Sequence, residues 1–394
     1  MHFAKHLLIS LTLCAPFGPA AFADISNTTI EAYNTAIAQT DRAAIIDASK
    51  ALAAEAVATP EHPDSVLLAY ETGAKLCEFG ACASALDAAN FVAAAPITDP
   101  EAHPLAEDRT LLASFANWSA DSNRKNRKAL ENTLTEIVPT QPSNLSILAF
   151  ATLYTSELNA GKTRNGAKIA GDAGDHLRPF AELVPRHFVS AEFVAAISHF
   201  NANQDSDAQL RMTHLQGWLG QYGTKLGETA PDWVADEQAR ASAWGLAMGA
   251  WYTSSRTRGS TKRGISPERL NAILESYTPK NVDTDPETTA LDLDESEGRL
   301  PFCEGELKQS PKLRYRAGDG QRGFFGAVIA GFDIEDGRVV NLVVKAAVPE
   351  DRFEENALRT VSQWMWEPSE NQSPGENCSM SRTNLALPLV FQLE

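Results

Sequence analysis

The sequence predicts an α+β protein in which an N-terminal all-α domain of helical repeats, a solenoid, is followed by a small domain of β-β-α-β order. Two patterns predict this class. Between residues 24 and 277, short segments rich in Ala and Leu recur with helical spacing, and prolines or brief turns separate them. Between residues 323 and 393, apolar residues instead alternate with a period of two on both sides of one helical run, which is typical of strands that pack with a helix.

Length and charge limit the possible classes of protein. The chain has 394 residues, which is too long for one compact core and suits two domains or an elongated array. Its formal net charge is −17. A nucleic-acid partner needs a basic field, and an anionic membrane surface repels an acidic chain, so neither partner is expected.

Residues 1–23 have the pattern of a signal peptide rather than of a folded element. An apolar run over residues 7–13 follows a positive start, and a motif of small residues ends at Ala23. We therefore predict cleavage after Ala23 and an exported mature protein. The apolar run is shorter than the about 20 residues that span a bilayer, and no other run is long enough, so no stable membrane span is expected. Lipid attachment at Cys14 is the alternative, which the large Leu13 disfavours.

The N-terminal domain is predicted to cover residues 24–280, with helices that pair into units of roughly 35 to 40 residues. This spacing is similar to that of tetratricopeptide repeats, and the best single unit, residues 67–96, has small residues where helices would cross closely. An irregular helical bundle is the alternative. The predicted helices cover residues 29–39, 43–58, 65–77, 81–95, 105–119, 126–137, 144–158, 167–177, 188–200, 207–222, 232–252 and 267–277.

Residues 281–300 are predicted to form an acidic linker between the two domains, because the segment is rich in carboxylates and poor in large apolar residues. Alternating acidic residues also occur in calcium loops, but the glycine that such loops need is missing. The acidic residues are Asp283, Asp285, Glu287, Asp292, Asp294, Glu295 and Glu297.

The C-terminal domain, residues 301–394, is predicted to form a three-stranded sheet with one helix. The first strand, residues 327–334, alternates as a half-buried strand does. Asp336 and Gly337 then supply the positive-φ positions of a tight hairpin, and a second strand runs from residue 338 to about residue 348.

Pro349 ends the second strand, and Asp351 is predicted to cap the helix that follows. One face of this helix is expected to lie on the sheet through Phe353, Ala357, Leu358, Val361, Trp364 and Met365. A third strand with a strict period of two is formed by Leu385, Leu387, Leu389, Phe391 and Leu393.

This pattern resembles the C-terminal domain of TonB, the periplasmic energy transducer of Gram-negative outer-membrane import. The spacing holds through two strands and a helix, which makes the resemblance fairly specific; any other small α+β domain with a hairpin is the alternative. The matching residues are Gly326, Val328, Ala330, Phe332, Ile334, Gly337, Val339, Phe353, Ala357, Leu358, Val361, Trp364, Trp366, Pro368, Gly375, Val390, Phe391 and Leu393.

The resemblance implies a periplasmic protein that takes part in protein–protein interaction at the cell envelope, linked to outer-membrane transport. In this family the last strand pairs with an extended segment of a receptor. The implied docking edge consists of Asn384, Leu385, Ala386, Leu387, Leu389, Val390 and Phe391. Pro388 cannot donate a hydrogen bond to a ladder, which suits an edge strand better than a central one.

The departures from the family concern energy coupling. TonB-like transducers keep an uncleaved N-terminal helix and a Pro-rich spacer, whereas this chain has a cleavable signal, a helical domain and a short acidic linker. The Tyr-Pro motif that usually opens the domain is not clear, and Ser310-Pro311 is the nearest approach. Transduction of proton-motive force by this chain alone is therefore not expected.

Four cysteines remain after cleavage of the signal, and an even number in an exported chain favours disulfides. Cys77 and Cys82 flank a short turn, and Cys303 and Cys378 lie at the edges of the C-terminal domain. We predict the bridges Cys77–Cys82 and Cys303–Cys378. No histidine lies near either pair, so the alternative of a metal site is disfavoured, and no metal or cofactor is expected.

The sequence contains no Gly-x-Ser-x-Gly, no His-Glu-x-x-His and no phosphate-binding glycine loop. Asp175 and His176 form a possible acid–base pair without a nearby nucleophile. An enzyme of the helical domain, for example one that resembles a muramidase, would need His176, His187 or His214 to converge with carboxylates. Catalysis is not expected, and no catalytic residue is assigned.

Two further groups of residues have a structural and a functional interpretation. Trp218, Trp233, Trp244 and Trp251 are expected to fill space between helices, with a concave peptide-binding face as the alternative. The basic residues between 256 and 263 are expected to form a solvated loop, with docking of an acidic peptide or of the chain's own linker as the alternative.

The sequence therefore predicts a non-catalytic periplasmic protein with a scaffold of helical repeats and a sheet edge that docks a peptide of a protein partner. A periplasmic enzyme is one alternative. Self-association is another, in which the edge strand of the C-terminal domain pairs with a second copy of the chain and forms a homodimer.

Overall fold

A computed structural model describes residues 24–97, 103–138, 140–258, 300–315, 318–319, 322 and 324–392. The predicted signal peptide, the predicted helix over residues 267–277 and the predicted linker except for residue 300 lie outside the described residues. So do Leu393, Lys262 and Arg263, whereas Arg256 and Arg258 belong to a helix over residues 232–258 rather than to the expected loop. The predicted domain boundaries therefore stay predictions.

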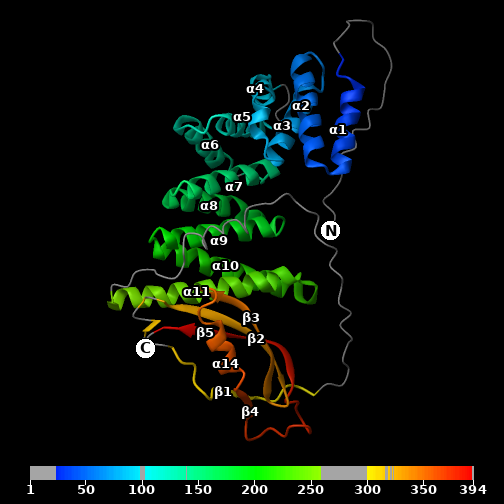
Figure 1. The fold of residues 1–394 in the computed structure, drawn as a ribbon. Coiled ribbons are helices and arrows are strands. Elements are labelled where there is room, and N and C mark those ends of the chain that lie inside the picture. Colours follow the sequence, from blue (N-terminus) through cyan, green and yellow to red (C-terminus); the bar gives the residue numbers. More distant parts are fainter. Residues whose placement is uncertain are drawn as a thin grey trace. The chain divides into compact units, whose positions relative to one another are not determined.

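The chain forms two compact units that divide between Thr133 and Leu134. The first unit consists of helices, and those between residues 27 and 120 each pack on the next along the chain (Figure 1). Asp41 starts the second helix, because its side chain accepts a hydrogen bond from the Ala44 amide at 3.0 Å. The elements are α1 (Asn27–Gln39), α2 (Arg42–Ala58), α3 (Ser65–Glu78), η1 (Cys82–Ala85), α4 (Leu86–Ala94), α5 (Ala106–Ala120) and α6 (Arg124–Ile137), which reaches the division.

The predicted disulfide of this unit is confirmed. Cys77, in the last turn of α3, is bonded to Cys82, the first residue of η1. Gly80, between them, has a φ of 76°, a left-handed conformation that favours glycine. The bridge therefore closes the turn between two packed elements.

The second unit continues the series of helices, and each again packs on the next. Ser143 and Ser146 form a capping box at the start of the first of them. Each helix predicted between residues 29 and 252 is confirmed, with ends that differ by a few residues. These elements are α7 (Asn144–Asn159), α8 (Thr163–Leu177), η2 (Arg178–Phe180), α9 (Pro185–Asn201), α10 (Asp205–Leu226), η3 (Gly227–Thr229) and α11 (Asp232–Arg258).

The C-terminal part of the second unit is an antiparallel sheet with one helix, α14 (Glu354–Val361), as predicted. The sheet has five strands in the order β1-β4-β3-β2-β5 rather than the expected three. The strands are β1 (Gly305–Lys308), β2 (Gly326–Glu335), β3 (Arg338–Val348), β4 (Met365–Pro368) and β5 (Arg382–Phe391). The additional strands, β1 and β4, are short and pair with each other.

Two expectations about the helix are wrong. Met365 lies on β4 and not on the helix, because the next residue, Trp366, donates its amide to the Gly337 carbonyl at 2.7 Å and draws the chain into the sheet. The N-cap is Phe353 and not Asp351, which instead has a φ of 56° in the preceding turn. Trp364 follows the helix but keeps its predicted place in the core, with 1% of its surface exposed.

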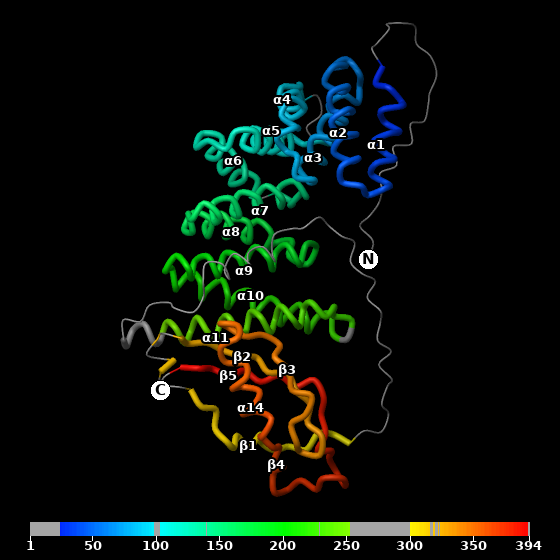
Figure 2. Tube along the Cα trace, viewed as in Figure 1, coloured from blue at the N-terminus to red at the C-terminus, as the bar shows by residue number. Residues whose placement is uncertain are grey.

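The sheet has helices on both faces, as Figures 1 and 2 show. On one face, Val328, Phe332 and Ile334 share a buried cluster with Phe353 and other residues of the α14 segment. On the other face, α11 packs against β2, β3 and β5. As a result Ala327 and Ile329 are also buried. The prediction of a half-buried first strand is therefore wrong, because α11 covers its second face.

A candidate peptide-docking edge

The β5 strand lies at one edge of the sheet. It pairs on one side with β2, from Gly326 opposite Phe391 to Ile334 opposite Arg382, and no described strand pairs with its other side. The opposite edge strand, β1, has four residues and carries Glu306 and Lys308. Short, charged edge strands resist pairing with other chains, whereas a ten-residue edge offers a long row of main-chain donors and acceptors.

The predicted docking residues divide between the two faces of β5. Leu385, Leu387, Leu389 and Phe391 belong to the core cluster or pack against it. Asn384, Ala386 and Val390 alternate with them, and Asn384 and Ala386 are exposed. The leucines therefore anchor the strand, and the main chain of the unpaired side is what a partner would meet.

The N-terminal half of β5 is fixed by one carboxylate. The Asn384 amide donates to Asp333 Oδ1 and the Asn341 side chain donates to Asp333 Oδ2, each at 2.8 Å. Both asparagines have positive φ values, 58° and 49°, and both ladders of β2 change register near this point. The two hydrogen bonds, from Asn341 and then from Asn384, lower the pKa of Asp333. Asp333 therefore holds the irregular parts of β3 and β5 to β2.

The residues of the TonB-like pattern have identifiable structural roles. A Cβ atom at Gly326 would lie 2.0 Å from the Val348 carbonyl oxygen, so only glycine fits there. Asp336 and Gly337 have the positive φ values predicted for the hairpin, 46° and 80°. The indole nitrogen of Trp364 donates to the Pro311 carbonyl at 2.7 Å.

The segment before β2 was not assigned a role from the sequence, although it completes the domain. Trp366 donates from its indole nitrogen to the Cys303 carbonyl at 3.2 Å, and β1 pairs with β4 from Gly305 opposite Pro368. The predicted bridge between Cys303 and Cys378 is confirmed. The two cysteines and the tryptophans were the available signals that this segment returns to the sheet.

The predicted acid–base pair of the helical domain does not form. His176 is fully buried, and its ring nitrogens lie 3.2 Å from Ser146 Oγ and 3.0 Å from the Val138 carbonyl oxygen. Burial lowers the pKa of His176. Asp175 instead pairs with Arg178 and Arg211. The ring of His176 therefore links α8 to the first turn of α7 and to the chain before it.

The other two candidate histidines lie apart from it. His187, on α9, lines a cavity of about 20 Å³ together with Tyr154 and Ser190, and burial lowers the pKa of its ring. That volume is close to the space of one water molecule. His214, on α10, is exposed. The described side chains therefore do not bring these histidines together with carboxylates.

Two of the four tryptophans fill the helical core as expected. Trp244 and Trp251 are buried and contact the Phe200 ring. Trp218 and Trp233 are half-buried on α10 and α11, and both contact the Tyr222 ring. The alternative of a concave peptide-binding face is not tested by these contacts.

Comparison with known families agrees with this geometry. Residues 312–384 match the family of the Gram-negative bacterial TonB protein C-terminal. The match covers β2, β3, α14 and β4 and ends at Asn384, within β5. It confirms the resemblance for this part of the chain. A search among curated proteins finds no match.

The matched family indicates a protein-interaction role at the cell envelope. In the part of the chain that the structure describes, every helix is too short or too polar to cross a membrane. Within the same residues, no cluster of three or more His, Cys, Asp or Glu side chains could hold a metal ion.

Proposed function

We propose that this chain is a non-catalytic periplasmic protein whose β5 edge binds an extended segment of another envelope protein by strand addition, linked to outer-membrane transport. The observation that carries the proposal is the ten-residue β5 strand, which has one paired side and whose leucines are fixed in the core. Strand addition uses main-chain hydrogen bonds, so the edge needs no catalytic group and no cofactor. The helical units would act as a scaffold that holds a second partner.

The test is site-specific photo-crosslinking in the Gram-negative envelope. A photoreactive residue replaces Ala386, which is exposed on β5, and in a matched control it replaces Glu306, which is exposed on β1. Neither side chain is in the core. Proline at Leu387 or Leu389 is a poorer test, because both leucines contact the core and their loss would unfold the domain.

We expect an adduct with one outer-membrane protein from position 386 and none from position 306. Equal adducts from both positions, or no adduct from position 386, would exclude β5 as the docking edge. An adduct with twice the mass of the chain would assign β5 to self-pairing, the homodimer alternative. A variant in which His176 is replaced by Asn tests the enzymatic alternative, since the proposal expects docking to be unchanged.

A further inference from the structure

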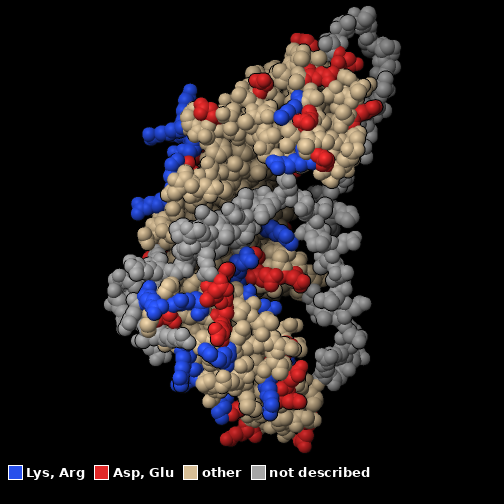
Figure 3. All heavy atoms as spheres, viewed as in Figure 1, with Lys and Arg blue, Asp and Glu red and all other residues tan. Residues whose placement is uncertain are grey.

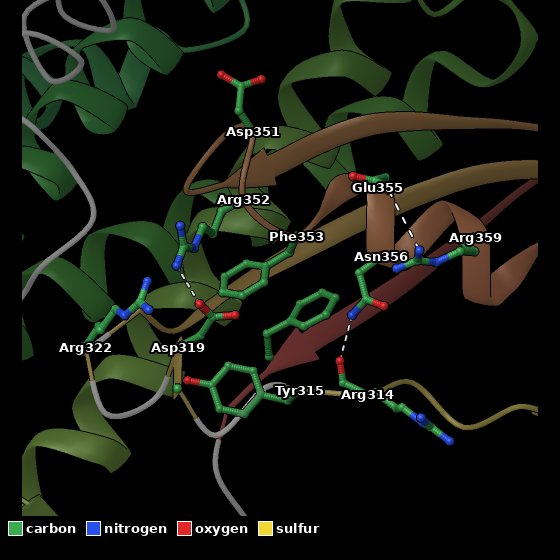
Figure 4. Close-up of a pocket in the computed structure, with 12 residues that line it drawn as sticks. Arg314, Tyr315, Asp319, Arg322, Asp351, Arg352, Phe353, Glu355, Asn356 and Arg359 are labelled. Atoms are coloured by element: carbon green, nitrogen blue, oxygen red, sulfur yellow. Dashed lines mark hydrogen bonds and ion pairs between the residues drawn. The ribbon is translucent and has the colours of Figure 1, made fainter.

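A cavity of about 350 Å³ opens in the C-terminal domain between the first turn of α14, the segment before β2 and the end of β5 (Figure 4). Three aromatic rings form one of its walls. The rings of Phe353 and Phe391 are stacked with centroids 4.4 Å apart, and the Tyr315 ring lies 6.2 Å from Phe353. Phe353 and Phe391 are 3% and 0% exposed, so the half-buried Tyr315 ring is the part of this wall that a ligand can contact.

The segment before β2 is held to the rest of the cavity. Arg352 forms an ion pair with Asp319 and lies 4.0 Å above the Phe324 ring. The Asn356 amide, in the first turn of α14, donates to the Arg314 carbonyl at 2.6 Å. These contacts join described residues of this segment to α14 and to the turn before it.

The charges around the cavity are mostly neutralised within the protein. Arg352 pairs with Asp319, and Arg359 lies 3.8 Å from Glu355. By contrast, no ion pair or side-chain hydrogen bond within the described residues involves the Arg322 guanidinium. The charged lining residues are Arg314, Arg322, Arg352, Arg359, Asp319, Asp351 and Glu355.

The arginines that line the cavity differ in the direction of their side chains. In Figure 4, Arg322 lies beside Asp319 and Arg352, whereas the Arg314 guanidinium points away from the rings. Acidic and basic side chains also lie next to each other over the visible face of the C-terminal domain (Figure 3). Two arginines, Arg322 and Arg352, therefore lie beside the one carboxylate of Asp319, which leaves a local excess of positive charge in a chain of net charge −17.

We propose that this cavity binds a carboxylate of the peptide that docks along β5. The inference rests on the docking function proposed above and adds a specificity to it. Phe391 is both the last residue of β5 and part of the aromatic wall. A peptide that pairs with β5 and continues past Phe391 therefore reaches the cavity. An acidic side chain or a terminal carboxylate at that point would accept charge-assisted hydrogen bonds from Arg322.

The experiment selects displayed random peptides on the full chain. The wild-type protein is compared with Arg322→Ser and with Arg338→Ser, a control that removes the same charge from an exposed position on β3. Selected sequences are aligned on their alternating apolar residues. The display format exposes either free C-termini or internal segments, so that a terminal carboxylate is distinguished from an Asp or Glu side chain.

We expect the wild type and Arg338→Ser to select a carboxylate at a constant position beyond the apolar residues. Arg322→Ser should lose this preference, and the selected acidic peptides should bind it about tenfold more weakly, as the loss of one hydrogen bond to a charged group implies. Apolar peptides without a carboxylate preference would overturn the cavity assignment and leave docking intact. If the wild type selects no peptide, both proposals fail.

Discussion

Because β2 is buried on both faces, we predict that Ile329→Ala reduces the stability of the sheet by an amount that can be estimated. Ile329 is 5% exposed and lies on the face that α11 covers, opposite the α14 cluster. Removal of three buried carbons from such a site costs about 2–5 kcal/mol. If α11 did not pack on this face, Ile329 would be exposed and the same change would alter stability by less than about 0.5 kcal/mol.

Hydrogen exchange at the amides of β2, measured on the full chain, is the suitable assay, because it reports local opening without assuming that two units unfold together. Val328→Ala, on the α14 face, should reduce protection whether or not α11 is present. Val343→Ala, at a position 47% exposed, should change it little. The reasoning is refuted if Ile329→Ala behaves like Val343→Ala while Val328→Ala weakens protection.

Three further predictions concern single interactions. Loss of the Cys303–Cys378 bridge through a double Ala variant should reduce the stability of the C-terminal domain by about 4 kcal/mol, seen as a lower thermal midpoint. Because the folded-state pKa of Asp333 is lowered, its stabilisation is present above the ordinary carboxyl pKa and lost as the pH falls through the folded value. When the pH is lowered, the stability of Asp333→Asn should therefore fall less than the stability of the wild type. Glu192→Gln, which removes the buried carboxylate between Arg178 and Arg211 and leaves them Asp175, should cost about 1–3 kcal/mol. Glu182→Gln, in an exposed pair, should cost less than about 1 kcal/mol by the same measurement.

The long elements of the fold were predictable from local pattern. The helices have many apolar positions, and two long strands flank the turn at Asp336 and Gly337. These elements contain enough residues for the hydrophobic period to be recognised. The run of Ala, Val, Ile, Ala, Gly and Phe over residues 327–332 also held a signal that it was buried on both faces, since a half-buried strand alternates with polar residues. The sequence did not predict that α11 covers the second face of β2, because the sequence of a helix does not specify which distant strand it packs against.

The short elements and the cavity depend on contacts between distant residues. The β1 and β4 strands have four residues each, which is too few for a period to be distinguished. Asp333 lies within the predicted first strand, but its bonds to Asn341 and Asn384 arise where the register shifts and could not be predicted from the strand pattern. The Arg322 side chain became a candidate only when the fold placed it in one cavity with residues of α14 and the end of β5.

The size of the edge limits what docking alone can achieve. A peptide paired along a ten-residue antiparallel edge forms about ten main-chain hydrogen bonds, because alternate residues face the partner and each of them exchanges two bonds with it. At about 1 kcal/mol each, these bonds alone correspond to a dissociation constant of about 0.1 µM. Ordering the peptide costs about 1–2 kcal/mol per residue, which offsets most of this gain and makes the affinity of the edge alone low. Pro388 removes one donor if its nitrogen faces outward. Both faces of β2 are already covered, so side-chain contacts that raise the affinity must come from exposed positions of β5, such as Ala386, and from the ends of the edge. A carboxylate at Arg322 would raise it about tenfold, which keeps the complex transient. Crosslinking is therefore expected to detect a partner that a washed pull-down loses, and a complex that survives washing would require a contact outside the β5 edge and the arginine cavity.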